Sequence, residues 1–110
     1  MTRMSAFTVY DLEKRVRERA AASPDVSYTR KLLDRGVAHC AKKLGEEAVE
    51  TVLAATVEDR DRLIAESADL IYHLLVVLKA RDISLAEVES ALAARVSTSG
   101  LEEKASRKPD

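Results

Sequence analysis

Acidic residues interrupt two stretches of this chain that otherwise have the pattern of buried helices. They are Glu46, Glu47 and Glu50 in the first stretch, and Glu66 and Asp69 in the second. Residues three or four positions apart share one face of a helix, so each group forms a stripe. The second stripe leads directly into the apolar run 70–78, so we expect this helix to enclose both of its carboxylates. Like charges on one face repel, and burying them unpaired costs far more, so the fold must place something positive between the two stripes.

Helix signals extend over most of the chain, and no segment alternates apolar and polar residues as a strand does. The chain has only three Gly and two Pro in 110 residues, as is typical of helical proteins. The expected helices run from residue 8 to about 22, from 28 to 34, from 37 to 57, from 59 or 61 to about 80, and from 84 to about 96. We therefore expect an all-α fold, an antiparallel bundle of four to five helices. Because so short a chain buries only a small core, we expect homo-oligomerisation to complete it.

Capping residues set several of these boundaries. Thr8 with Asp11, and Ser84 with Glu87, have the spacing of a capping box, in which each residue bonds the backbone of the other. Ser27 is suited to cap the short second helix. Residues 1–96 are expected to form one domain. The segment 97–110 lacks apolar periodicity and is expected to be a frayed tail.

Composition argues against several classes of protein. The net charge of −1 and the isoelectric point near 6.1 give no field that favours nucleic acid or an anionic membrane. The single cysteine, Cys40, excludes an internal disulfide and a cysteine-based zinc site, and we expect it to be a small buried side chain. The run 70–78 contains His73 and is too short to span a bilayer. A cytoplasmic protein is the expectation.

The break between the two acid-bearing helices is short, which makes them antiparallel neighbours. Glu47 and Glu50 on one helix and Glu66 and Asp69 on the other can then share an ion. Several carboxylate oxygens suit a hard cation, so the pattern predicts a Mg²⁺ site that also accepts Mn²⁺. The competing interpretation is a solvated charged face.

Other polar residues surround the acids. Lys43 falls on the same side of the helix as Glu46 and is a candidate phosphate contact. Lys42 faces another side, and the simpler interpretation is that it is exposed to solvent. His73 lies one turn beyond Asp69, where it can hydrogen-bond a ligand carboxylate or simply pack in the core. Gly45 lies inside a helix, which indicates close approach by a partner helix or a ligand.

The motif Glu47-x-x-Glu50 followed by Glu66-x-x-Asp69 resembles the signature of the all-α, MazG-like nucleoside triphosphate pyrophosphohydrolases. Three longer segments narrow the resemblance to the phosphoribosyl-ATP pyrophosphohydrolases of histidine biosynthesis. These segments are 27–33 (Ser-Tyr-Thr-Arg-Lys-Leu-Leu), 42–50 (Lys-Lys-Leu-Gly-Glu-Glu-Ala-Val-Glu) and 68–75 (Ala-Asp-Leu-Ile-Tyr-His-Leu-Leu).

The resemblance implies a stand-alone enzyme that converts phosphoribosyl-ATP and water to phosphoribosyl-AMP and pyrophosphate. It implies Mg²⁺ at the four acids of the signature, and substrate contacts from Lys43, with Lys42, Tyr28 and Thr29 as further candidates. Glu46 could ligate a second ion or orient the attacking water. It also implies a homo-oligomer, a dimer or tetramer, in which helices of two subunits build each site.

Three alternatives compete with this interpretation. A pyrophosphohydrolase for another, noncanonical nucleoside triphosphate would share the fold and the acids. A di-iron bundle would use Glu-x-x-His pairs, but neither His39 nor His73 stands three residues after a Glu. A non-enzymatic helical interaction module would need no turnover at all.

Overall fold

The computed structural model describes residues 6–96, Lys104 and Arg107. Within residues 6–96 the chain forms five helices and no strand, which confirms the predicted all-α fold. The helices are α1 (Val9–Ala20), α2 (Tyr28–Asp34), α3 (Val37–Val57), α4 (Arg60–Ala80) and α5 (Leu85–Val96).

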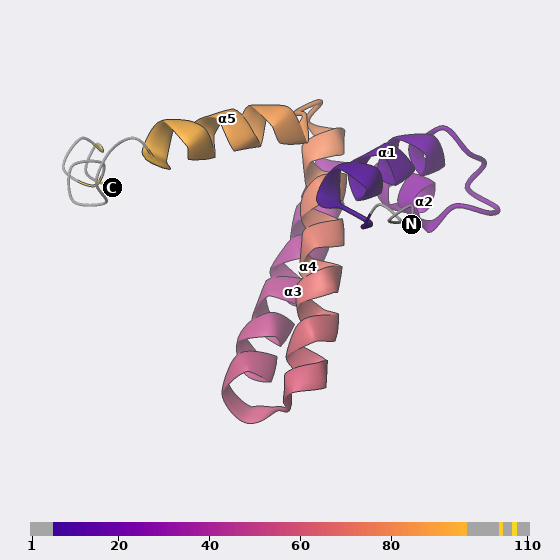
Figure 1. The fold of residues 1–110 in the computed structure, drawn as a ribbon. Helices are drawn as coiled ribbons and strands as arrows, with labels where there is room; N and C mark the ends of the chain where they lie inside the picture. The colour runs from indigo at the N-terminus through magenta and orange to yellow at the C-terminus, as the bar shows by residue number, and fades with distance from the viewer. Residues whose placement is uncertain (1–5, 97–103, 105–106, 108–110) are drawn as a thin grey trace, which may run out of the picture.

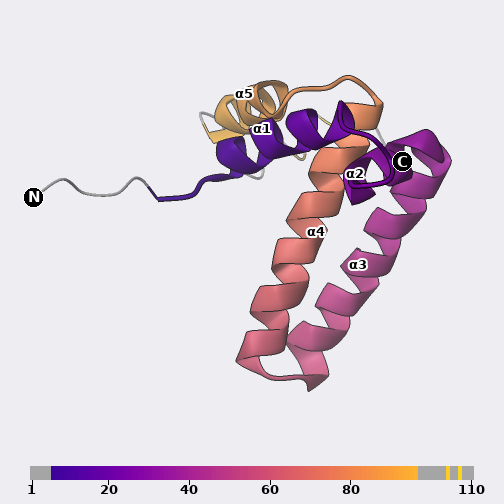
Figure 2. The ribbon, with the colours of Figure 1, turned by 90° about the vertical axis from the view of Figure 1, so that its right-hand side faces the viewer.

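The two longest helices, α3 and α4, form an antiparallel hairpin (Figure 1). The short helices α1 and α2 pack across the end of the hairpin at which α3 begins and α4 ends, as Figure 2 also shows. Helix α5 leaves that same end and projects away from the hairpin, so the other half of α3 and α4 stands uncovered within the described chain. The expected antiparallel pairing of the two acid-bearing helices is confirmed.

The core lies at the covered end of the hairpin. Its fully buried members come from four helices: Val16, Leu32, Cys40, Leu75 and Val76. Each fits an apolar stripe at helical spacing, which is why four helices can meet there. The Cys40 thiol donates a hydrogen bond to the carbonyl oxygen of Leu32 at 3.2 Å, so this cysteine is the buried side chain that was expected.

Capping side chains define the helix starts. Thr8 and Asp11 form the predicted capping box, and so do Ser84 and Glu87, whose carboxylate accepts from the Ser84 backbone N–H at 2.8 Å. Asp59, rather than Asp61, caps α4 by accepting from the N–H of Arg62 at 2.9 Å. These bonds satisfy N–H groups that have no partner within the helix.

Two boundaries show how the chain turns. Helix α1 ends at Ala20, two residues earlier than expected, because Ala21 closes it with hydrogen bonds back to Glu18 and Arg19. Gly36 precedes α3 with φ of +95°, a conformation that side chains other than glycine rarely adopt. It allows α3 to begin almost at once after α2.

Two expectations concern regions beyond this core. The predicted frayed tail, 97–110, lies outside the described residues except for Lys104 and Arg107. Among the described helices, none combines the length and the apolar character that crossing a membrane requires.

Candidate metal and phosphate site

Three carboxylates from the two hairpin helices converge midway along their length. Glu47 comes from α3, and Glu66 and Asp69 come from α4. One oxygen of each lies within 4.8 Å of the others. The antiparallel hairpin brings the two predicted stripes together, so three of the predicted ligands form one cluster.

Thr51 fixes the register of the hairpin beside these acids. Its hydroxyl donates to the carbonyl oxygen of Glu47 at 2.8 Å, one turn back on its own helix. It also contacts the carbonyl oxygen of Glu66 on the neighbouring helix at 3.2 Å. A small hydroxyl side chain at this position lets α3 and α4 approach closely where both carry acids. The sequence analysis did not identify this residue.

The acids differ in burial. Glu66 is only 5% exposed, Glu47 is half-buried and Asp69 is exposed, so the expectation that α4 encloses both of its acids is right for Glu66 and wrong for Asp69. One oxygen of Glu47 and one of Glu66 (Oε2 in each) are buried without a hydrogen-bond partner. Buried polar atoms normally have a partner, so these two oxygens need a cation or a proton.

Burial and crowding raise the pKa values of two of these carboxyls. Burial raises the pKa of Glu47 to about 7, and the neighbouring carboxyl of Glu50 and the charges of Asp69 and Glu66 add to the effect. Burial and Glu50 likewise raise the pKa of Glu66. Glu50 is exposed and lies outside the cluster of three, but it is close enough to disfavour ionisation of both neighbours. Its role as a fourth ligand stays a prediction.

The donor set fits a divalent cation. Opposite ligands of Mg²⁺ stand about 4.2 Å apart at bond lengths near 2.1 Å, close to the 4.8 Å spread of the three oxygens. All the donors are carboxylate oxygens, the type that Mg²⁺ and Mn²⁺ prefer. An ion here would also satisfy the two buried oxygens that lack partners.

Arg62 supplies a positive charge that the sequence analysis missed. Its guanidinium donates to Glu66 at 2.8 Å and to Glu58 at 3.3 Å. Arg62 stands four residues before Glu66 on α4, and that spacing is the signal that could have revealed it. Arg62 pairs with Oε1 of Glu66, whereas Oε2 is the oxygen that has no partner.

The predictions for the other candidate residues of α3 have mixed outcomes. The Lys43 ammonium lies 3.1 Å from Glu46, so the shared side predicted for these two is confirmed, but Glu46 is not one of the three clustered carboxylates. Lys42 is exposed. Apart from its two chain neighbours and the adjacent backbone of α3, no atom of the described residues lies within 4 Å of a Cβ built on Gly45. The close approach expected at Gly45 is therefore not made by this chain's own described residues.

The remaining candidates lie where α2 meets α4. Thr29 is buried, and its hydroxyl and that of Tyr72 are 2.5 Å apart, which gives Thr29 a packing role. Tyr28 is exposed, and its ring stands edge-on to that of His73 at 6.5 Å. His73 is buried and its Nδ1 has no hydrogen-bond partner in the described chain. Contacts from Thr29 to substrate and from His73 to a ligand carboxylate stay predictions.

Comparison with known proteins shows the family to which the chain belongs. The family model for phosphoribosyl-ATP pyrophosphohydrolase matches residues 9–96. The chain belongs to the phosphoribosyl-ATP pyrophosphohydrolase family. The matched segment contains all five helices and every acid of the cluster, so the family resemblance seen in the sequence is confirmed.

This chain aligns with other phosphoribosyl-ATP pyrophosphatases along nearly the whole length of both proteins. Phosphoribosyl-ATP pyrophosphatase 1 of Bradyrhizobium diazoefficiens is 66% identical over 105 residues, covering 96% of this chain and 99% of the relative. The protein of the same name from Rhodopseudomonas palustris is 60% identical over 107 residues, 97% of this chain and 100% of the relative. The phosphoribosyl-ATP pyrophosphatase of Agrobacterium fabrum is 59% identical over 104 residues, 94% of this chain and 97% of the relative.

Proposed function

We propose that this chain hydrolyses the α–β phosphoanhydride of 1-(5-phosphoribosyl)-ATP, releasing phosphoribosyl-AMP and pyrophosphate, the second step of histidine biosynthesis. The observation that carries the proposal is the cluster of Glu47, Glu66 and Asp69, two of whose buried oxygens lack a partner, in a chain of this family. We expect the reaction to take place in the cytoplasm.

Glu47, Glu66 and Asp69, with Glu50 beside them, would hold Mg²⁺, or Mn²⁺ in its place. A divalent ion bound there neutralises phosphate oxygens and polarises the phosphorus that water attacks. Phosphoryl transfer needs positioning and charge neutralisation more than covalent chemistry. Carboxylates that hold a metal ion and a lysine that holds a phosphate oxygen are residues of the type that this reaction needs.

Lys43 is the side chain best placed to hold a phosphate oxygen next to the acids. It lies one turn before Glu47 on α3 and is itself partly exposed. The pKa of Lys43 is raised by its hydrogen bond and ion pair with Glu46, which keeps the ammonium charged. Glu46 thereby orients Lys43, and its proposed part in placing the attacking water is a separate prediction.

The proposal also includes a homo-oligomer. The uncovered half of the hairpin exposes large apolar side chains on both helices: Val49, Val52, Leu53 and Val57 on α3, and Ile64 on α4. Ile71 and Leu74, nearer the covered end of α4, are also exposed. The radius of gyration is 16.6 Å, whereas a compact chain of this length would have about 13 Å. An apolar surface of this extent on an open hairpin is typical of an interface between subunits.

We expect the protein to be a dimer or tetramer in solution, and light scattering coupled to size exclusion measures its mass. Val52→Asp, at a position 61% exposed in the single chain, should shift the mass toward that of a monomer, because it would bury a charge in the interface. Arg15→Asp, on the exposed side of α1, is the control. A wild-type mass equal to one chain over a range of concentrations would contradict the oligomer.

The activity itself is tested by pyrophosphate release from phosphoribosyl-ATP with and without Mg²⁺, beside a panel of ordinary and modified nucleoside triphosphates. We expect turnover of phosphoribosyl-ATP that depends on the metal. Turnover of another triphosphate in its place would assign the same site to a different pyrophosphohydrolase. No release from any member of the panel would favour a helical interaction module.

A further inference from the structure

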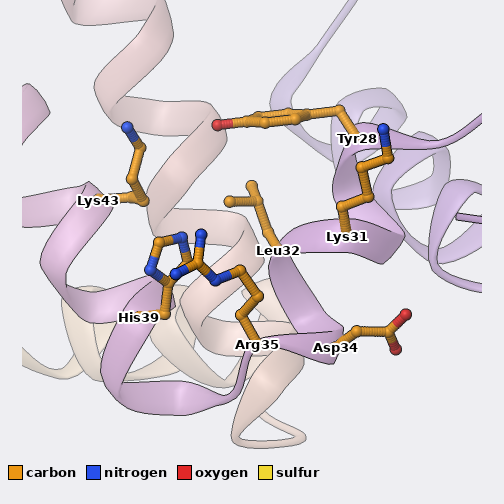
Figure 3. Close-up of a pocket in the computed structure, with 7 residues that line it drawn as sticks. All are labelled: Tyr28, Lys31, Leu32, Asp34, Arg35, His39 and Lys43. Atoms are coloured by element: carbon orange, nitrogen blue, oxygen red, sulfur yellow. The ribbon is translucent and has the colours of Figure 1, made fainter.

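A cavity opens between α2 and the start of α3, near the acidic cluster. Its volume is about 460 Å³. Figure 3 shows the residues that line it: Tyr28, Lys31, Leu32, Asp34, Arg35, His39 and Lys43. Four of these are basic side chains, so we call the cavity the basic pocket.

The positive charge of the basic pocket is not cancelled by its one acidic lining residue. Asp34 points away from the opening in Figure 3, and its carboxylate accepts from the Arg30 guanidinium at 2.8 Å. Lys31 and Arg35 come from the end of α2, and Lys43 comes from α3. Only Lys43 has an anionic partner within this chain that the structure describes, the exposed Glu46.

The pKa of His39 is affected by its place among the positive charges of the pocket. Its pKa is lowered, first by desolvation and then by the charges of Arg35, Lys42 and Lys43. At neutral pH its imidazole is therefore uncharged and can still donate one hydrogen bond. In Figure 3 the hydroxyl of Tyr28 points toward the Lys43 ammonium across the opening, so it adds a further donor.

The basic pocket and the acidic cluster are two ends of one surface. Lys43 lines the basic pocket and also the groove along α3 that contains Glu46, Glu47 and Glu50. His39 precedes Glu47 by eight residues on α3, and a helix rises 1.5 Å per residue, so the two positions are about 12 Å apart along the axis. A ligand with one anionic group at each end could reach both.

We propose that the basic pocket binds the 5′-phosphate of the substrate's phosphoribosyl group, and so distinguishes the substrate from ATP. The assignment rests on the proposed function. In 1-(5-phosphoribosyl)-ATP the phosphoribosyl group is on N1 of the adenine and the triphosphate-bearing ribose is on N9, at opposite edges of the ring. With the triphosphate at the acidic cluster, the phosphate monoester points toward Arg35, His39 and Lys31. Arg35 supplies a planar fork that matches phosphate oxygens.

The kinetic test compares Arg35→Gln with Arg15→Gln, an equal change of charge on the exposed side of α1. We expect Arg35→Gln to raise KM for phosphoribosyl-ATP by about 10-fold or more and to change kcat by less than about 3-fold, because a charge-assisted bond is lost in substrate and transition state alike. Arg15→Gln should leave both constants unchanged. An unchanged KM in Arg35→Gln would overturn the proposal.

A binding test separates this proposal from the proposed activity. Ribose 5-phosphate carries the same phosphate monoester and no triphosphate, and calorimetry or NMR titration measures its binding directly. We expect the wild type and Asp69→Asn to bind it, and Arg35→Gln to lose that binding. If the wild type releases no pyrophosphate but still binds ribose 5-phosphate through Arg35, the activity is wrong and the pocket stands. Binding that survives in Arg35→Gln, or is absent from the wild type, overturns the pocket.

Discussion

Asp69→Asn is expected to lower pyrophosphate release from phosphoribosyl-ATP by at least about 100-fold, more than the loss of a group that only supports a metal ligand typically causes. Asp69 contributes one of the three oxygens that lie within 4.8 Å of one another. The substitution keeps the size of the side chain and removes its charge. Because Asp69 is exposed, the variant should fold as the wild type does. Steady-state assays with circular dichroism measure both expectations.

Asp61→Asn is the matched control for this experiment. Asp61 is an exposed acid in the first turn of the same helix, two turns before Asp69 and outside the cluster. We expect it to retain wild-type turnover. A change of less than about 3-fold in kcat/KM for Asp69→Asn would contradict the metal site, because so small a loss is below that expected for a neutralised ligand.

The second large effect is on stability, which should depend jointly on pH and divalent metal. In the metal-free protein the pKa of Glu47 is raised to about 7, so between its ordinary value near 4.5 and 7 the folded state binds more protons than the unfolded state. The stabilising contribution of this group is therefore complete at low pH and is lost as the pH rises toward 7. Partial exposure and coupling to its neighbours reduce the size of the loss, which we place at about 1–2 kcal/mol.

Mg²⁺ or Mn²⁺ should reverse this loss at neutral pH. A ligand that binds only the folded state stabilises it by mass action, by about 2.7 kcal/mol when its free concentration is 100 times Kd. Because the ligands must be deprotonated, the increase in Tm should be larger at pH 8 than at pH 5. Thermal melts across this pH range, with metal and with chelator, measure both effects.

Glu47→Gln isolates the contribution of this one group. The variant cannot ionise at this position, so the difference in unfolding free energy between it and the wild type should change in the pH interval 4.5 to 7 and level off outside it. The variant should also show a smaller increase in Tm with Mg²⁺. A wild-type Tm that is the same with millimolar metal and with chelator at pH 8 would count against a site that binds the ion directly.

The sequence predicted the helices of this protein well because local interactions decide them. The side chains of Thr8, Ser27, Asp59 and Ser84 accept hydrogen bonds from N–H groups three residues further on, so the start of each of these helices depends on residues within about one turn. The short break after Val57 likewise left α3 and α4 only an antiparallel arrangement. The end of α1 was less certain, since it depends on which carbonyls Ala21 reaches.

The site was predicted only in part. The spacing of the acids placed Glu47, Glu66 and Asp69 on facing stripes, but it could not show that Glu46 pairs with Lys43 and is not one of the three clustered carboxylates, since neighbouring residues on one stripe differ by side-chain rotamer. The expected burial of Asp69 was also wrong, because the burial of a helix face depends on which other helices cover it. Arg62 was missed although its spacing from Glu66 was visible.

The sequence by itself determined the fold class, most of the helix starts, the family and the four acids of the signature, because each of these depends on residues close together along the chain or on the family's own pattern. Only the tertiary structure decided which oxygens converge, that Thr51 joins the two helices beside them, and that Arg35 and His39 share a pocket with Lys43. The physical reason is that convergence depends on how α2, α3 and α4 pack, and packing is set by contacts between residues far apart in the sequence.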